Sequence, residues 1–335
     1  QFKFQLREMM VEDADGNWWM VGYETGEWYR HNGTDWVQAD HGCFVKSDEA
    51  RISIFDRGFL YGDGLFETMR AYSGRVFMVE DHIQRLFESA DVLEIPLERD
   101  RDALRSAIER LLDLNSLYDA YIRLTVSRGI HSGVLTFNGS YEPTVIITAK
   151  ELSPYPPEYY AHGAKVIIGS IRQNSFSPLS HHKSLSYFGN LLVKEEARKK
   201  GAIDAVLLNT EGDVAECATS NIFIVRSEQI FTPPLWSHIL PGVTRKVILT
   251  LAPQLGLEVE EKKIRQEELF ASDEVLLTNS LMEVMPVVEI NGEKVGSGKP
   301  GPFSVKIAEA YKTSVRRFCN DQQRSLYSGR HFMER

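Results

Sequence analysis

The amino-acid sequence predicts a mixed α/β protein built from two domains. Its 335 residues exceed what one ordinary core requires and suit two domains of typical size. Segments with apolar residues at helical spacing alternate with short apolar segments that are typical of strands. A proline-rich stretch, SPYPPEYY at residues 153–160, separates two such regions and is typical of a connection between domains. Together these observations favour an α+β or mixed α/β architecture.

The patterns divide the chain into an extension at residues 1–43, a smaller α+β domain at 44–150, a connection at 151–162, a larger domain at 163–320 and a C-terminal tail at 321–335. Four of the five tryptophans lie in the extension, among Asp-Gly, Thr-Gly and Asn-Gly pairs. Because glycine accepts the positive φ of tight turns, this pattern predicts a short Trp-rich β-meander. We interpret it as a structural appendage packed on the main body, with a peptide- or sugar-binding module as the alternative.

Strand and helix patterns alternate through both expected domains. In the smaller one, LFETMRAY and RVFMVE predict a hairpin that turns at Ser73 and Gly74. Helices are expected over residues 80–93, 98–115, 189–201 and 242–256. Further strands are expected over 119–129, 143–152, 165–173, 204–210, 221–227 and 273–280.

Composition argues against several function classes. Lys and Arg total 38 against 47 Asp and Glu, and a net charge of −9 does not suit a nucleic-acid surface, which needs clustered positive charge. No apolar run approaches the roughly 20 residues that span a bilayer, and no leader opens the chain, so we expect a cytoplasmic protein without a membrane partner. Cys43, Cys217 and Cys319 are too scattered for a disulfide framework or a CxxC metal site.

LSHHKSLSYFGNLL, residues 179–192, places Lys183 after two histidines and before the start of a helix. An ordinary surface lysine is a poor nucleophile because its pKa lies near ~10.4, whereas burial or a cationic neighbour lowers that pKa and frees the amine. A metal site on His181 and His182 is disfavoured, because adjacent residues turn toward one ion only in a special loop and no other ligand has a suitable spacing. This segment alone leaves a reactive amine, a surface lysine and a metal site open.

Three other segments supply partners for a reactive amine. Glu216, in EGDVAECATSNIFIV, lies among apolar strands, where a carboxylate is costly unless it meets a cation such as a protonated pyridine nitrogen. The Pro-Gly turn of ILPGVTRKVIL leads Val243 and Thr244 into the first turn of a helix, which favours a phosphate. Small polar residues at 278–280 end a strand and can complete that site. An amine, a buried carboxylate and an anion site are the groups that hold pyridoxal phosphate.

Six segments, taken in order and spacing, resemble the class IV aminotransferases, the fold-type IV pyridoxal-phosphate enzymes. They are FDRGFLYGDGLFETMR, DHIQRL, HHKSLSYFGNLLVKEEA, GDVAECATSNIF, LPGVTRKVIL and DEVLLTNSLMEVMPV. The family includes branched-chain aminotransferases, D-amino-acid aminotransferases and aminodeoxychorismate lyases. The resemblance covers about residues 44–318 and leaves residues 1–43 outside. It implies a two-domain enzyme with pyridoxal 5'-phosphate as its cofactor, and a homodimer in which a loop of the partner subunit completes each site.

The resemblance assigns the ring end of the cofactor to three residues. Lys183 forms the Schiff base and is the catalytic residue, and Glu216 pairs with the pyridine nitrogen. Tyr187 is similar to the tyrosine that, in branched-chain enzymes, hydrogen-bonds the phenolic oxygen of the cofactor, although the alignment needs a gap of one residue.

At the phosphate end, the resemblance assigns Arg85 in HIQRL to a charged contact. Val243 and Thr244 supply contacts at a helix N-terminus, and Ser280 supplies a hydroxyl group. The alternative for Arg85 is a solvated arginine on an amphipathic helix.

Substrate contacts are expected from two segments. Tyr121 and Arg123, in AYIRLTVSRG, occupy alternate positions of an expected strand, so their side chains face the same way and can bind a substrate carboxylate. The alternative for Arg123 is an edge-strand arginine paired with a surface acid. Arg128 and His131 follow in the next loop and leave a preference for D-amino acids open. Thr68, in FETMR, is the fifth candidate.

Transamination between a branched-chain-like or D-amino acid and a 2-oxo acid is the preferred interpretation, because AYIR and Tyr187 are similar to the branched-chain enzymes. Lys183 would move the proton between the substrate Cα and the cofactor C4′. An aminodeoxychorismate lyase of 4-aminobenzoate and folate synthesis is the alternative, favoured by Thr68 and by NSLMEVMPV, although SRGIHSGVL lacks the later arginine of the lyase pattern. A third interpretation, a Trp-rich binding module on an inactive enzyme, conflicts with the intact Lys183, Glu216 and Arg85.

Overall fold

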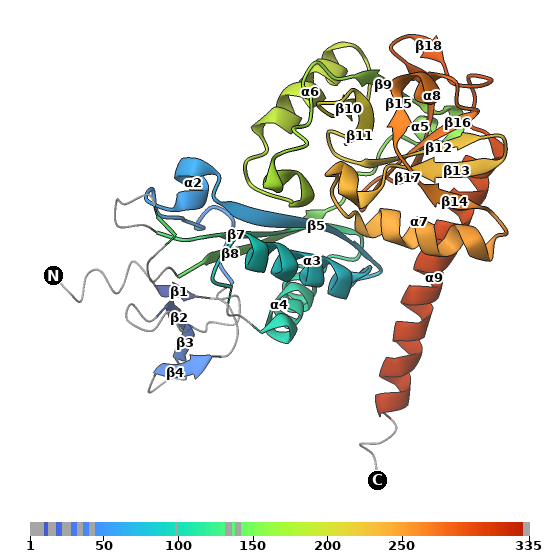
Figure 1. Cartoon of the computed structure of the whole chain (residues 1–335). Coiled ribbons are helices and arrows are strands. Elements are labelled where there is room, and N and C mark those ends of the chain that lie inside the picture. The colour runs from blue at the N-terminus through green and yellow to red at the C-terminus, as the bar shows by residue number, and fades with distance from the viewer. Residues whose placement is uncertain are drawn as a thin grey trace.

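The computed structural model describes residues 44–97, 100–130, 136–137 and 142–330, and four short strands before residue 40 (Figure 1). For those four strands and for residues 321–330 only the backbone is described. The strands are β1 (Met10–Glu12), β2 (Trp18–Val21), β3 (Trp28–His31) and β4 (Trp36–Ala39). They pair antiparallel in the order β1-β2-β3-β4. The turns and side chains of this extension lie outside the described residues, and its structural role stays a prediction.

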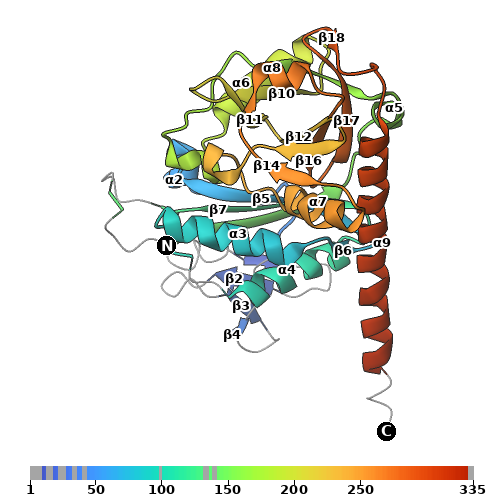
Figure 2. The same ribbon diagram turned by 45° about the vertical axis from the view of Figure 1, so that its right-hand side comes forward.

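A four-stranded antiparallel sheet with the order β6-β5-β7-β8 follows. Its strands are β5 (Gly64–Tyr72), β6 (Arg75–Val76), β7 (Ala120–Ser127) and β8 (Thr144–Glu151). The helices of this region are α2 (Arg57–Tyr61), α3 (Val79–Val92) and α4 (Arg101–Leu114). Both α3 and α4 cover one face of the sheet (Figure 2). Apolar residues such as Met69, Ile83 and Ile122 are buried between the helices and the sheet.

The hairpin expected in this sheet turns at Ser73 and Gly74, both with positive φ. The strand expected to run on to residue 80 is much shorter. Met78 has a φ of 55°, and α3 begins at the next residue, so β6 ends at Val76.

A ten-stranded mixed sheet forms the rest of the body, in the order β14-β13-β12-β16-β17-β9-β10-β11-β15 with β18 beside β17. Its strands are β9 (Ala164–Ile168), β10 (Asp204–Leu208), β11 (Asp213–Cys217), β12 (Asn221–Arg226), β13 (Gln229–Thr232), β14 (Val259–Glu261), β15 (Ile264–Arg265), β16 (Glu274–Asn279), β17 (Glu283–Ile290) and β18 (Glu293–Lys294). Its helices are α5 (Pro157–His162), α6 (Phe188–Lys199), α7 (Val243–Gln254), α8 (Gln266–Phe270) and α9 (Pro302–Arg330), with 3-10 turns η1 (Pro178–His181) and η2 (Leu235–Ser237). These elements confirm the mixed α/β prediction.

The last helix, α9, is not among the helices that the sequence patterns predicted. Tyr311 and Val315 of α9 are buried, and Phe77 packs edge-on against Tyr311 and Phe318. Beyond this contact, α9 extends away from the body (Figures 1 and 2). Residues 321–330 are therefore helical and continue α9, whereas the sequence placed them in a separate tail.

The loop that carries Lys183 connects the two sheets. The amide of Phe66 donates to the Lys183 carbonyl at 2.8 Å, and the amide of Leu185 donates to the Gly64 carbonyl at 2.9 Å. The loop thus pairs with the edge of β5, although it belongs in sequence to the second half of the chain. A Cβ atom at position 64 would lie 2.4 Å from the Val126 carbonyl oxygen, so this close packing requires glycine.

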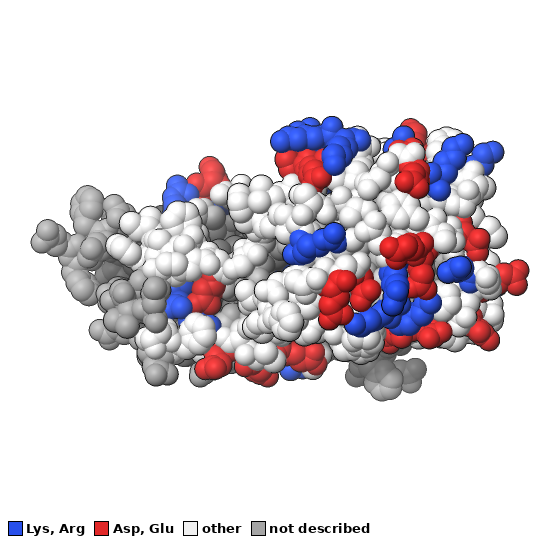
Figure 3. Space-filling model, turned by 45° about the horizontal axis from the view of Figure 1, so that its top comes forward, with Lys and Arg blue, Asp and Glu red and all other residues white. Residues whose placement is uncertain are grey.

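Charge is distributed without a large field of one sign on the face shown in Figure 3, where basic side chains lie beside acidic ones. Within the part of the chain that the structure describes, no helix has the length and apolar character needed to cross a bilayer.

Candidate active site

A pocket of about 660 Å³ lies between the two sheets. Both halves of the chain contribute to it, since β5 and β7 supply one wall and the Lys183 loop, β11, α7 and the end of β16 supply others. Ten of the twelve site residues expected from the sequence line it: Thr68, Arg85, Tyr121, Arg123, Lys183, Tyr187, Glu216, Val243, Thr244 and Ser280.

Lys183 places its amine among aromatic rings. Its Nζ lies 4.4 Å from the centre of the Phe66 ring and 5.6 Å from that of Tyr187. Burial, together with the nearby charge of Arg85, lowers the pKa of Lys183 to about 8, and the carboxylates of Glu67 and Glu216 only partly oppose this. Among the described residues the amine forms no ion pair within 4.0 Å. It is therefore a lysine with a substantial neutral fraction near pH 8, as nucleophilic and base chemistry require.

Glu216 lies on β11 and is held by three hydrogen bonds. Its Oε2 accepts from Asn221 Nδ2 and from the Leu240 amide, each at 3.2 Å, and its Oε1 accepts from Gln173 Nε2 at 3.3 Å. Burial nevertheless raises the pKa of Glu216 to about 8. No lysine or arginine of the described chain forms a salt bridge with it, so the carboxylate is oriented but has no cationic partner. A ring nitrogen that carries a proton would fit this position.

The first turn of α7 forms an anion site at the other end of the pocket. Gly242 is its N-cap and provides no side chain to the free amides of Val243 and Thr244. A Cβ at position 242 would lie 1.8 Å from Asn221 Oδ1, so glycine lets the turn approach the residue that also holds Glu216. Thr278 lines this region, and its buried hydroxyl has no hydrogen-bond partner among the described residues. These unpaired donors fit the phosphate of the expected cofactor.

Arg85 reaches this pocket from α3 with a partner that sequence reasoning missed. Glu67 on β5 is 1% exposed and accepts hydrogen bonds from Arg85 Nε at 2.8 Å and Nη2 at 2.6 Å. Arg85 Nη1 donates to the Pro241 carbonyl at 2.9 Å, just before the anion site. Arg85 is thus not a solvated helix arginine. A bidentate clamp on one side leaves guanidinium N–H groups for an anion on the other.

His82 was also missed. It is 1% exposed, and its Nδ1 lies 2.8 Å from Glu67 Oε2. His82 and Arg85 are three positions apart on α3, so the helical period places both on the face that meets Glu67. The spacing in DHIQRL indicates that His82 and Arg85 share one face of the helix. The carboxylate that joins them comes from a separate strand, which the local spacing does not show.

The substrate-facing wall is built by β5 and β7, where Thr68 is paired with Arg123. The Arg123 guanidinium lies 3.9 Å above the Phe66 ring, and its Nε donates to Thr125 Oγ1 at 3.2 Å. In the described chain it has no carboxylate partner, and β7 lies between β5 and β8. The alternative of an edge-strand arginine paired with a surface acid is therefore wrong for the described residues.

Tyr187 lines the same wall of the pocket. Its ring meets Phe66 edge-on, with 5.3 Å between the ring centres, and its hydroxyl donates to the Ala218 carbonyl at 2.8 Å. The adjacent histidines point to separate partners: His182 Nδ1 lies 2.9 Å from Ser89 Oγ, and the His181 ring packs on His238.

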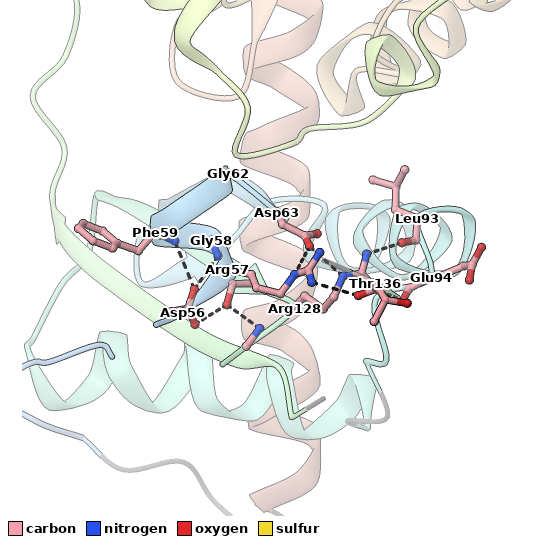
Figure 4. Close-up of polar contacts among 12 residues, drawn as sticks. Asp56, Arg57, Gly58, Phe59, Gly62, Asp63, Leu93, Glu94, Arg128 and Thr136 are labelled. Carbon is pink, nitrogen blue, oxygen red and sulfur yellow. Dashed lines mark hydrogen bonds and ion pairs between the residues drawn. The ribbon is translucent and has the colours of Figure 1, made fainter. Parts of the chain in front are cut away.

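Arg128 is not placed at the pocket. The residue is 1% exposed, its Nε pairs with Asp63 Oδ2 at 2.9 Å, and its Nη2 donates to the Leu93 carbonyl at 2.8 Å (Figure 4). Arg57 Nε binds the same Asp63 oxygen at 2.7 Å. The network ties the end of β7 to α2 and α3, so the expected substrate contact of Arg128 is not supported by its placement. His131 lies outside the described residues.

Comparison with known proteins finds aminotransferases by family model and by sequence identity. The family model for amino-transferase class IV matches residues 64–290. A Methanocaldococcus jannaschii protein named as a branched-chain-amino-acid aminotransferase is 37% identical over 273 residues, which cover 81% of this chain and 94% of that protein. The D-alanine aminotransferase of Bacillus licheniformis is 32% identical over 276 residues, covering 82% and 95%.

Solved structures agree with these relatives. The branched-chain amino acid aminotransferase of Escherichia coli superposes with a TM-score of 0.78 at 31% identity, covering 82% of this chain and 92% of that chain. A Legionella pneumophila structure described as a 4-amino-4-deoxychorismate lyase gives a TM-score of 0.71 at 28% identity, covering 77% and 93%.

Proposed function

Because the chain belongs to the class IV aminotransferases, we propose that it exchanges an amino group between an amino acid and a 2-oxo acid, with Lys183 as the catalytic amine. Pyridoxal 5'-phosphate, the cofactor of this family, supplies when bound the aldehyde that carries the amino group and the ring that stores the electron pair of the broken Cα–H bond. The observation that best supports the proposal is that one pocket holds the Lys183 amine, the anion site of α7 and the Glu216 carboxylate, which has no cationic partner among the described residues.

Each end of the pocket has a part in holding the cofactor. Glu216 would accept the N–H of the ring nitrogen and keep it charged, which compensates the buried carboxylate. Arg85, the amides of Val243 and Thr244, and the Ser280 hydroxyl would hold the phosphate.

Lys183 would then act as the base. With a pKa of about 8, its amine is free to a useful extent at neutral pH and can take the proton from the substrate Cα and return it at C4′. The rings of Phe66 and Tyr187 limit the space around Nζ, which keeps the amine near the reacting carbons.

The substrate carboxylate would bind Arg123. This guanidinium faces the pocket without a carboxylate partner in the described chain, and Tyr121 and Thr68 lie on the same wall. The relatives are named for two substrate classes, one for branched-chain amino acids and another for D-alanine. Tyr121 and Arg123 keep the pattern of the branched-chain enzymes, and we propose branched-chain-like L-amino acids as the first substrates to test, with D-amino acids as the second.

A substrate panel tests this proposal. The full chain with its cofactor is incubated with L- and D-forms of valine, leucine and alanine and with 2-oxoglutarate or pyruvate, and transfer is measured as new amino acid. We expect transfer from at least one donor. Borohydride reduction followed by peptide mass spectrometry should place the cofactor on Lys183, and a label on another lysine would contradict the assignment.

A lyase of the same family is the second candidate. Thr68 lines the pocket at the position where the lyase has threonine, and a structure described as such a lyase resembles the chain. Aminodeoxychorismate belongs in the same panel for this reason. Pyruvate release from it, without transfer from any amino acid, would replace the aminotransferase proposal.

A cytoplasmic homodimer completes the proposal. Phe59 and Leu60 on α2 and Phe188 and Leu191 on α6 are exposed. The two helices adjoin, because Ser186 Oγ contacts the Gly62 carbonyl at 3.5 Å. Such a patch suits burial against a second copy. Light scattering should give the mass of two chains, and Phe59→Glu should shift it toward one; a wild-type mass of one chain would contradict the dimer.

A further inference from the structure

A chain of three side chains runs from the interior to the anion site. Glu67 Oε2 lies 2.8 Å from His82 Nδ1, and His82 Nε2 lies 3.3 Å from Ser280 Oγ. Glu67 and His82 are almost fully buried, while Ser280 lines the pocket. The contact also joins the two halves of the chain, since His82 lies on α3 and Ser280 follows β16.

The positions of the protons follow from Glu67. Burial alone would raise the pKa of this carboxyl, but the charge of Arg85 and the hydrogen bonds from His82 and Arg85 lower it to about 2, so Glu67 is ionised. An ionised carboxylate accepts only, and His82 Nδ1 must therefore carry a hydrogen. Burial keeps the pKa of His82 below its usual value, so the ring is neutral and its Nε2 has no hydrogen.

This arrangement fixes the Ser280 hydroxyl in the free site. Because Nε2 is an acceptor, Ser280 donates its hydrogen to His82 and presents only lone pairs to the anion site. An arriving phosphate dianion also presents lone pairs. Two acceptors that face each other in a buried site are costly. In the free site the Ser280 O–H therefore points away from the anion that it is expected to bind.

We propose that His82 takes up one proton when a phosphate dianion enters the site, and that this proton turns the Ser280 hydroxyl toward the phosphate. The proposal rests on the phosphate site of the proposed function and deepens it. The proton comes from water and binds Nε2. The new Nε2–H donates to Ser280 Oγ, and the Ser280 hydrogen is then free to donate to a phosphate oxygen.

The charges around the His82 imidazole suit protonation that depends on the bound anion. The Glu67 carboxylate at Nδ1 stabilises the imidazolium, whereas the cations of Arg85 and Lys183 oppose it in the free site. A phosphate dianion beside these cations reverses the balance, because it adds negative charge on the same side. Protonation of His82 is thereby linked to occupancy of the anion site.

Calorimetry on the cofactor-free full chain tests this link, with phenyl phosphate as the probe. This probe has neither an aldehyde for Lys183 nor a ring nitrogen for Glu216, and it is a dianion above about pH 6. Titration at pH 8 in buffers of different ionisation enthalpy counts the protons taken up. We expect net uptake, and a Kd that rises by up to about tenfold per pH unit between about pH 7 and 8.5.

The His82→Gln variant isolates the histidine, because Lys183 titrates in the same range and adds its own protons. Its uptake should fall by most of one proton, and Ser280→Ala, which leaves the Glu67–His82 contact intact, should lower it as well. His182→Gln changes the other histidine with a serine partner and should leave uptake at the wild-type level. In the wild-type holoenzyme, ¹⁵N spectra should show one buried imidazolium that persists at pH 8.

Equal proton uptake in the wild type and His82→Gln would overturn the inference, as would a neutral His82 in the holoenzyme. Failure of phenyl phosphate to bind at all would also overturn it. The proposed function is judged separately by amino-group transfer, which can persist when His82 takes up no proton. If amino-group transfer were absent while proton uptake was intact, the proposed function would be contradicted and this inference would still hold.

Discussion

Two buried carboxylates, Glu67 and Glu216, face the same pocket and have opposite states. Glu67 is clamped by Arg85 and His82, and the pKa of its carboxyl falls to about 2. Glu216 receives three hydrogen bonds but no lysine or arginine salt bridge within the described chain, and burial raises its pKa to about 8. The comparison teaches that burial alone does not fix a carboxyl's charge. The cations around it do, and a site that lacks one is prepared for a cation from elsewhere.

Lys183 lies close to both carboxylates, and its removal should give the largest effect. Lys183→Ala should reduce amino-group transfer by about 10⁴-fold or more, because a positioned base and the covalent attachment are both lost. Transfer assays with the cofactor in excess measure this. Lys246→Ala, a surface lysine paired with Asp81, is the control and should stay near the wild type. Retained activity in the Lys183 variant would remove the catalytic role.

Glu67→Gln tests the carboxylate that is paired with Arg85 and His82. The change leaves Arg85 buried without its bidentate partner, and loss of one member of a buried pair costs about 3–5 kcal/mol. We expect a clearly lower melting temperature of the cofactor-free chain at pH 7. The same substitution at Glu216 is the matched control and should not lower the melting temperature at this pH, because within the described chain that carboxyl has no ion pair to lose. Equal destabilisation by Glu67→Gln and Glu216→Gln would contradict the difference proposed between the two carboxylates.

Glu216→Gln tests, through turnover, the carboxylate that has no cationic partner in the described chain. A glutamine cannot keep the ring nitrogen charged, so we expect the cofactor to remain bound while turnover falls by about 10²–10³-fold, the range of one electrostatic contact in a transition state. Absorbance of the bound cofactor and single-turnover rates separate binding from chemistry. Unchanged turnover would take Glu216 out of the mechanism.

Sequence patterns identified this contrast only in part. Glu216 was found because a carboxylate among apolar strands needs a cation, and the α7 site was found because Pro241 and Gly242 mark a helix start. Glu67 was missed because it lies on β5, far in sequence from the Lys183 loop it faces, and no local pattern shows that its partners come from α3. In the same way, the strand period placed Tyr121 and Arg123 on one face correctly.

Arg128 shows where local reasoning fails, because it follows the end of β7. The turn of the chain there, and not the strand period, carries its side chain to Asp63, Leu93 and Glu94. The fold class followed from alternating periods, whereas α9 was not predicted at all.

The last and smallest effect is the pH dependence of stability without cofactor. The folded-state pKa of Glu216 lies above its unfolded value near ~4.3, so the folded chain binds the extra proton and stability falls as pH rises toward about 8. For Glu67 the folded-state pKa is depressed, so its stabilisation is complete above ~4.3 and is lost as pH falls toward about 2. The free energy of unfolding obtained from urea titrations should therefore fall by an amount on the order of 1–2 kcal/mol between about pH 6 and 7.5, and Glu216→Gln should flatten the decline. Bound cofactor should flatten it too, because the ring cation then compensates the carboxylate. A slope that survives in both cases would show that another group controls it, and the contrast between the two carboxylates would lose its energetic basis.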